Sequence, residues 1–312
     1  MKMKLLSITL ILVLILLIVP ASAAMTMTQA KEKALEYAKN DEWRDVSGPY
    51  SYQSKSYYYV EYGKSYNATG ILVLDAETGD IIKDKNIAEK VAYTHYYLWN
   101  VTDKYITDTE NAIDVYKLSA VVCRQKSDMF KSELPAYKDA DRKKVEQSVN
   151  AYSEVAGLWD QKASVMEEMI PILKDITSGN KSYESAMIIT KKIDEFEKTL
   201  NSISTAYDKI SESTDIYCDV LIANSNLHAM TNQQVEDYRT ATKTVLKQEK
   251  KQLITEQLNL IEAEKKEMDE NITRDMKFMD ARIEKAETPG FGIVVAVSAL
   301  LIVGMFMRNR RK

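Results

Sequence analysis

The chain has 312 residues, of which 45% are hydrophobic and 28% charged, and its formal net charge is −4. Acidic and basic residues are interleaved, so no basic face indicates nucleic acid as a partner. Only 9 glycines and 5 prolines interrupt a sequence rich in Lys, Glu and Ala, which predicts a mainly helical protein.

Residues 1–23 have the layout of a secretory signal peptide. A basic start precedes an almost unbroken apolar stretch at residues 5–19. Small residues then supply an Ala-x-Ala cleavage site, formed by Ala21, Ala23 and Ala24. We expect cleavage near Ala24 and export of the chain; the alternative is an uncleaved N-terminal anchor.

Residues 26–85 predict a small α+β domain. An alanine-rich helix is expected at 28–39, followed by a loop around Gly48 and Pro49. Aromatic and β-branched runs predict strands at 56–62 and 70–75. A tight turn with Gly79 at positive φ then leads to a short returning strand at 80–83.

This order of elements resembles the PepSY domain. The resemblance rests on the strand around Tyr59 and on a hairpin with the pattern Asp-x-x-Thr-Gly, formed by Asp75, Thr78 and Gly79. PepSY modules accompany secreted peptidases or stand alone on cell surfaces, so the resemblance implies binding or inhibition and brings no catalytic residue. The alternative is a meander in which Asp75 and Thr78 only shape a turn.

Seven tyrosines fall between Tyr50 and Tyr66. They could form a stacking surface for sugars or peptides. Alternation along a strand instead places Tyr57 and Tyr59 on one face of the sheet and Tyr58 and Tyr62 on the other. Because both faces carry tyrosine, we favour packing within the sheet.

Residues 86–287 predict an elongated antiparallel helical bundle with coiled-coil packing. Steps of four and three residues define a seam that includes Leu200, Ile203 and Ile210, and a second seam runs from Val145 to Leu173. A first helix, starting as early as Ile87, carries an apolar face through Phe130 to Leu134. In a fourth helix, from about 232 to 286, Leu246, Leu253 and Leu260 recur at seven, beside Ile254, Ile261 and Met268. After a stutter-like shift the stripe continues with Ile272, Met276, Met279 and Ile283. Short breaks between the helices predict antiparallel neighbours.

The sequence contains few residues that could bind a metal ion or catalyse a reaction. Cys123, Cys218, His95 and His228 could form a metal site by number, but Cys218 and His228 lie ten residues apart on one predicted helix, about 15 Å by rise. Nucleophile, zinc and phosphate-loop motifs are lacking, so we expect neither a cofactor nor catalysis. Export permits a Cys123–Cys218 disulfide, although diagonal helices would hold the sulfurs too far apart. Asn224 and His228 are either a polar, pH-sensing layer or a frayed end of the core.

Four Asn-x-Ser/Thr sequons are possible N-glycosylation sites in an exported chain. They begin at Asn67, Asn100, Asn180 and Asn271.

Residues 288–312 close the chain with three features in order. The tripeptide Pro289, Gly290 and Phe291 opens an apolar run that ends at Met307, and a basic cluster follows from Arg308 to Lys312. The run is at the short end of what spans a bilayer, and the basic cluster indicates a cytoplasmic end. Together they resemble the PGF-CTERM sorting signal, which implies that an archaeosortase removes the tail and that a lipid replaces it. The alternative is an ordinary C-terminal transmembrane helix.

These features favour a non-enzymatic archaeal cell-surface glycoprotein, anchored at its C-terminus, with a binding or structural role. One alternative is a modulator of a surface or secreted peptidase, acting through the PepSY-like domain. Another is an extracellular ligand-binding component of a surface complex. The expected partners are the membrane, an archaeosortase-like enzyme, and either surface-layer proteins or a peptidase.

Overall fold

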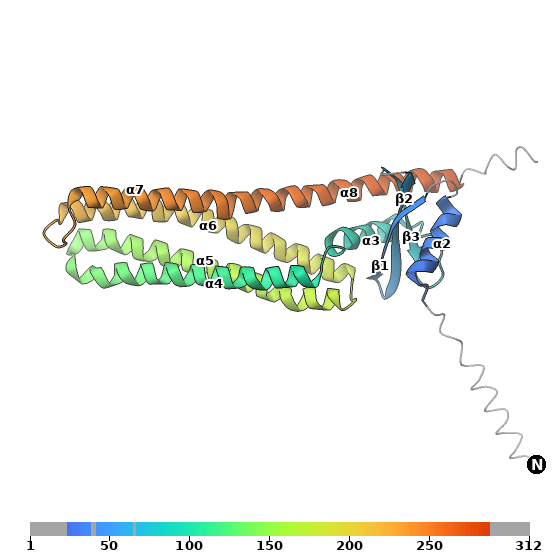
Figure 1. Cartoon of the computed structure of the whole chain (residues 1–312), viewed down its shortest axis with the longest axis horizontal. Helices are drawn as coiled ribbons and strands as arrows, with labels where there is room; N and C mark the ends of the chain where they lie inside the picture. The colour runs from blue at the N-terminus through green and yellow to red at the C-terminus, as the bar shows by residue number, and fades with distance from the viewer. Residues whose placement is uncertain (1–23, 39–41, 65–66, 288–312) are drawn as a thin grey trace, which may run out of the picture. The chain divides into compact units, whose positions relative to one another are not determined.

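The computed structural model describes residues 24–38, 42–64 and 67–287 and divides them into two compact units (Figure 1). Unit 1 comprises residues 24–96 and 270–287, and unit 2 comprises residues 97–269. Unit 2 is therefore an insertion within unit 1 in the sequence. Unit 1 also contains two segments expected in the helical part of the chain, most of α3 (Lys85–Leu98) and the end of α8 (Glu256–Glu287).

Unit 1 is built on a three-stranded antiparallel sheet with strands in the order β1, β2, β3. The strands are β1 (Glu42–Tyr52), β2 (Lys55–Lys64) and β3 (Asn67–Asp75). Side chains alternate across the sheet as expected. Tyr58, Val60 and Tyr62 pack with the alanines of α2 (Met27–Ala38). Tyr57 and Tyr59 pack on the opposite face, with α3 and with Met276 and Met279 of α8.

The loop expected around Gly48 and Pro49 is wrong, because these residues lie within strand β1. The pairing of β1 with β2 is irregular between Ser47 and Tyr50, which is where the proline falls. Since β1 is an edge strand, an irregularity can accommodate a residue without an N–H donor. The returning strand expected at 80–83 is reduced to a single bridge between Leu74 and Ile81.

Unit 2 contains the long helices. They are α4 (Asp103–Glu133), α5 (Asp139–Thr177), α6 (Tyr183–Ala223) and α7 (Asn232–Glu249), with the first part of α8. A short 3₁₀ turn (Leu134–Ala136) precedes α5, and α5 contacts both α4 and α6. The predicted burial of Leu200, Ile203 and Ile210 is confirmed.

Helix α4 begins later than the earliest predicted start at Ile87. A separate helix, α3, covers that region, and α4 starts after Thr102, whose hydroxyl accepts a hydrogen bond from the Tyr105 amide. Such a cap satisfies one of the free amides at a helix start. Helix α5 also buries more than its predicted seam, because it packs between two helices. The additional buried positions are Ser148, Ala151, Val155, Lys162, Val165, Met169 and Ile176.

The seam of the fourth predicted helix changes register. A π-helical turn, η2 (Lys250–Thr255), separates α7 from α8. Such a turn holds one more residue than an α-helical turn. Within this turn Ile254, which the predicted stripe includes, is buried, whereas Leu260 is 59% exposed, so the prediction of Leu260 in the seam is wrong.

Candidate functional site

A buried polar cluster in unit 1 joins the end of α8 to the sheet. The carboxylate of Asp275 is fully buried and accepts hydrogen bonds from the hydroxyls of Tyr59 and Tyr96, the latter at 2.6 Å. Arg274 donates to the same carboxylate through Nε and Nη2 at 3.1 and 3.0 Å. A buried charge requires such partners, because an unpaired carboxylate in an apolar environment is costly. The cluster therefore fixes α8 to β2 and α3.

His95 extends this cluster toward strand β1. Its ring stacks on that of Tyr59, with centroids 4.2 Å apart and an interplanar angle of 12°. Its Nδ1 lies 2.9 Å from the Ser47 hydroxyl and 3.0 Å from the Tyr50 hydroxyl. Strand β1, strand β2 and helix α3 thus meet around one imidazole.

The phenols of this cluster are held in their neutral form. Burial raises the pKa of Tyr50 to about 12, and burial together with the Asp275 charge raises the pKa of Tyr59 well above its ordinary value. Burial and the hydrogen bond to Asp275 also raise the pKa of Tyr96. Tyr59 and Tyr96 remain hydrogen-bond donors, which suits a structural clasp. We name Tyr59, Tyr96, Arg274 and Asp275 the Asp275 clasp.

The Asp275 clasp is not predicted from the sequence. The available signal was an acidic residue within an apolar stripe, because Asp275 lies between Ile272 and Met276 on a predicted seam. The partners of Asp275 lie about 180 and 216 residues earlier in the chain, so spacing along the sequence does not reveal them.

The hairpin residues of the PepSY resemblance form a well-defined turn. The Asp75 carboxylate accepts hydrogen bonds from the amides of Glu77 and Thr78, at 2.9 and 3.1 Å. Gly79 follows with φ +75°, as predicted from the sequence. These contacts account for Asp75, Thr78 and Gly79 as turn-forming residues.

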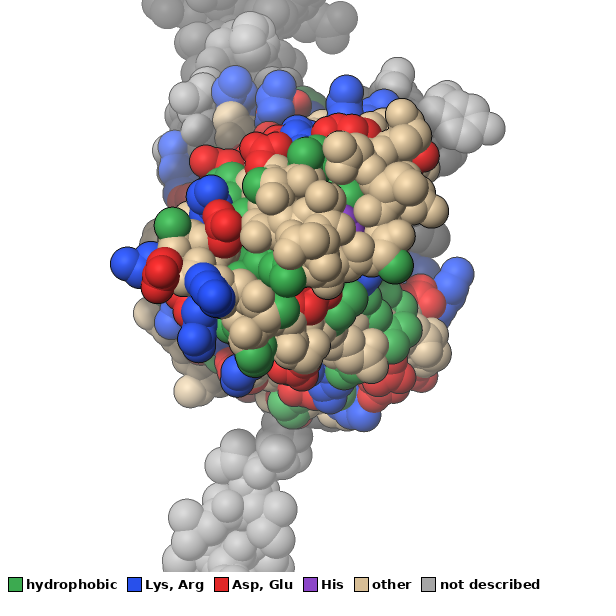
Figure 2. All heavy atoms as spheres, turned by 90° about the vertical axis from the view of Figure 1, so that its left-hand side faces the viewer, with side chains coloured by type: hydrophobic (Ala, Val, Ile, Leu, Met, Phe, Trp, Pro, Cys, Tyr) green, Lys and Arg blue, Asp and Glu red, His purple; other side chains and the backbone are tan. Residues whose placement is uncertain are grey.

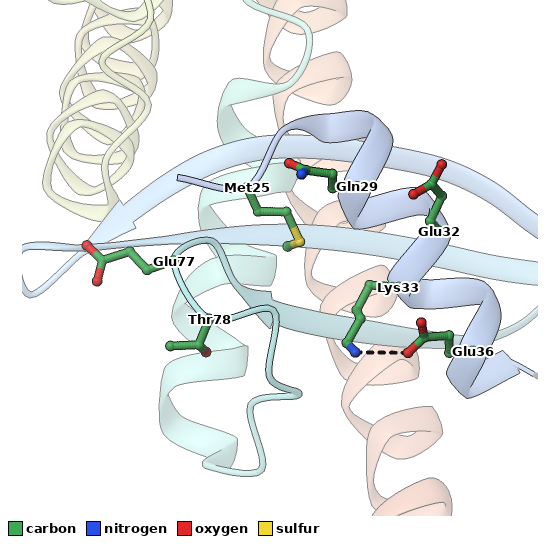
Figure 3. Close-up of a pocket in the computed structure, with 7 residues that line it drawn as sticks. All are labelled: Met25, Gln29, Glu32, Lys33, Glu36, Glu77 and Thr78. Carbon is green, nitrogen blue, oxygen red and sulfur yellow. Dashed lines mark hydrogen bonds and ion pairs between the residues drawn. The ribbon is translucent and has the colours of Figure 1, made fainter. Parts of the chain in front are cut away.

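A shallow hollow lies between this turn and α2 (Figure 3). Its rim carries the exposed carboxylates Glu32 and Glu77, and an ion pair between Lys33 and Glu36 at 2.9 Å. Met25, Gln29 and Thr78 complete the lining. The rim is therefore mostly acidic.

Unit 2 contains a second unexpected polar group, the amine of Lys162, which is fully buried. Its Nζ lies 3.8 Å from the centroid of the Tyr116 ring, and two further rings surround it, those of Trp159 and Phe196. Gln257 of α8 accepts its hydrogen bond at 3.0 Å. Burial lowers the pKa of Lys162 to about 7, while the aromatic faces favour the charged form.

The cysteines and His228 have structural surroundings. Cys123 and Cys218 are free thiols, and burial raises the pKa of Cys123 to about 11. His228 lies 2.7 Å through Nε2 from the Leu221 carbonyl, and its Nδ1 accepts a hydrogen bond from the Met230 amide. His228 therefore organises the connection after α6.

Figure 2 shows acidic and basic side chains mixed around an end of the molecule.

The sequons occupy different settings. Asn100 and Asn180 are exposed in connections between helices, and Asn271 is partly buried within α8. Three predicted features lie outside the described residues: the side chain of Asn67, the cleavage-site residues Ala21 and Ala23, and the motif Pro289, Gly290 and Phe291. Ala24 is described and exposed.

Across residues 24–287, with their two gaps, the structure contains no metal-binding group of three or more His, Cys, Asp or Glu. None of the helices in this part of the chain has the length and hydropathy of a membrane span.

The C-terminal segment of the chain matches a known family of sorting motifs. The model of the PGF-CTERM motif family matches residues 288–310, directly after the last residue of α8. The chain is thus a C-terminally anchored cell-surface protein. The match implies processing by an archaeosortase and attachment to the membrane. No curated protein and no solved structure matches the chain.

Proposed function

We propose that this chain is a non-enzymatic archaeal cell-surface glycoprotein with a binding or structural role, in which unit 1 attaches unit 2 to the anchor. The observation that carries the proposal is the position of the Asp275 clasp. Helix α8 ends at Glu287, one residue before the PGF-CTERM match, and Asp275 lies twelve residues before that end. The helix leading to the anchor is therefore held by the sheet of unit 1.

The insertion of unit 2 within unit 1 supports this assignment. Its two ends return to unit 1 at Tyr96 and Glu270, and Tyr96 is itself part of the clasp. Positions 97–269 are thus available for binding or assembly without contributing to attachment. The carboxylate of Asp275 accepts a hydrogen bond from Tyr96, and the amine of Lys162 donates one to Gln257. Because each buried group is bound by its own neighbours within the chain, both agree with a non-catalytic role.

The experiment expresses the full chain in an archaeal host that processes PGF-CTERM proteins. We expect the mature protein to be surface-exposed, to lack the residues from about Phe291 onward and to carry a lipid at its new C-terminus. Replacement of Pro289, Gly290 and Phe291 by alanine should leave the tail attached. The matched control replaces Glu284, Lys285 and Glu287 by alanine, which should leave processing unchanged. Intact-mass measurement of the membrane fraction distinguishes these products, and an untruncated native protein would contradict the proposal.

The acidic hollow favours a second candidate, a modulator of a surface or secreted peptidase. It lies beside the turn that carries the PepSY resemblance (Figure 3). Co-purification of a peptidase with the full chain, and its loss in Glu32→Lys/Glu77→Lys, would support this function. Glu89→Lys, at an exposed position of α3, is the control. Recovery of another ligand or of surface-layer proteins would instead indicate an extracellular binding component.

A further inference from the structure

Helix α4 has two apolar stripes on opposite sides. One is the core stripe, which includes Ile113, Ala120 and Phe130. The other is exposed, with relative exposures of 58% for Val115, 63% for Leu118, 47% for Val122 and 38% for Met129. At about 100° per residue, the second stripe points away from the first by roughly half a turn. We name Val115, Leu118, Val122 and Met129 the outer seam.

The outer seam has the spacing of a coiled coil. Its steps are three, four and seven residues, and the position between Val122 and Met129 that completes the pattern is Gln125. The same pattern extends back to Asn111, and both amides are exposed. Isolated exposed hydrophobic residues need no explanation, but a heptad repeat on the solvent side of a helix matches a partner helix.

The structure assigns this outer seam to a parallel, in-register contact with α4 of a second copy of the chain. In that arrangement each seam residue faces its own equivalent. Val115, Val122 and Met129 then form layers at one heptad position, and Leu118 forms a layer at the other. Valine at the first position and leucine at the second favour two-stranded parallel pairing.

The polar seam positions distinguish this partner from the alternatives. In parallel register, Gln125 faces Gln125 and Asn111 faces Asn111, and each amide can donate to and accept from its equivalent. In the antiparallel register that pairs Leu118 with Val122, Gln125 would face Val115 and Asn111 would face Met129. Each amide would then be buried against an apolar side chain, which is costly.

Anchoring brings a second copy within reach. Every copy is held at its C-terminus on the same membrane surface. The opposite side of α4 is already engaged with α5, through ion pairs of Lys117 with Glu167 and Arg124 with Asp160. With four apolar residues per copy the seam is small, so we expect pairing to depend on the high local concentration of anchored protein.

Disulfide crosslinking of the full chain in membranes tests the proposal. Gln125→Cys should give a covalent dimer under mild oxidation, because equivalent seam positions meet in parallel register. In the antiparallel register the two cysteines would be about 15 Å apart along the axis, beyond the reach of a disulfide. Lys131→Cys, exposed on the other side of α4, is the matched control, and the unaltered chain gives the background from Cys123 and Cys218.

A second variant tests the chemistry of the seam. Leu118→Glu in the Gln125→Cys chain should abolish the covalent dimer by placing like charges in facing positions. Its thermal midpoint should equal that of Gln125→Cys alone, because Leu118 contributes little to the core. Crosslinking of Lys131→Cys as efficient as that of Gln125→Cys, or no dimer from Gln125→Cys, would overturn the proposal. A dimer that forms only between Val115→Cys and Gln125→Cys chains would show antiparallel pairing and overturn it as well.

Discussion

The hydroxyl of Tyr59 donates a hydrogen bond to the carboxylate of Asp275, 216 residues later in the chain. Tyr59 belongs to the second strand of the sheet, and Asp275 belongs to the helix that leads to the anchoring motif. This contact joins the N-terminal α/β part of unit 1 to the last described helix. The contact holds together the two chain segments of unit 1, which unit 2 separates in the sequence.

Asp275→Ala should destabilise unit 1 by about 3 kcal/mol, because it removes the common acceptor of Tyr59 and Tyr96 and the carboxylate that pairs with Arg274. The amides of β2 and β3 should exchange faster with solvent deuterium. Lys277→Ala, an exposed substitution on the same helix, is the control and should leave exchange unchanged. Equal protection in Asp275→Ala and the unaltered chain would show that the clasp does not hold the sheet.

Lys162→Met should stabilise unit 2 near pH 7 and remove a pH dependence. The folded pKa of about 7 is below the unfolded value of 10.5, so the unfolded chain binds more protons between these values and stability rises with pH. The advantage of Lys162→Met should therefore fall by about 2 kcal/mol between pH 7 and pH 9. Comparing the two chains cancels the titration of tyrosines and cysteines that both contain.

Chemical denaturation monitored by helical circular dichroism at both pH values measures this difference. Lys251→Met, at an exposed position, is the matched control and should show no such change. A constant difference between the unaltered chain and Lys162→Met would mean that the aromatic rings keep Lys162 charged throughout this range.

Gly79→Val and Gly157→Ala should change stability in opposite directions. Gly79 has φ +75°, a conformation that a β-branched residue adopts poorly, so we expect a loss of about 1–2 kcal/mol. A Cβ at Gly157, within α5, would meet no atom within 4 Å. Gly157→Ala should therefore gain about 0.5–1 kcal/mol from helix propensity. Thermal unfolding of both variants, followed separately in the two units by hydrogen exchange, tests the pair.

Deletion of Gln252 should be tolerated within about 1 kcal/mol, because it removes the extra residue of the π-helical turn η2 and leaves the buried positions on either side in phase. Deletion of the exposed Glu264 should cost more than about 3 kcal/mol, since it rotates every later residue by about 100° relative to Ile261. Denaturation midpoints of the two chains measure the contrast. Similar losses would show that the register change at η2 is not the reason for the turn.

The seam of α6 shows why much of the fold was predictable from the sequence. Leu200, Ile203 and Ile210 follow a heptad pattern, and a helix must bury such a stripe wherever its partners lie. The turn at Gly79 was predictable for a similar reason, because it depends on neighbouring residues. Strand β1 was missed because its irregularity at Pro49 is compatible with a strand only at the edge of a sheet.

The sequence by itself determined the helical class, the apolar seam of α6, the turn at Gly79 and the C-terminal sorting motif, since each depends on residues close together in the chain. The tertiary structure alone decided that Lys162 enters an aromatic cage, that Leu260 stays exposed although it continues the heptad of Leu246, and that Asp275 meets Tyr59 and Tyr96. These outcomes depend on which helices and strands become neighbours after folding. Burying a charged residue of an apolar stripe is costly unless other side chains pair with it. Those partners come from distant segments, so spacing along the chain cannot identify them.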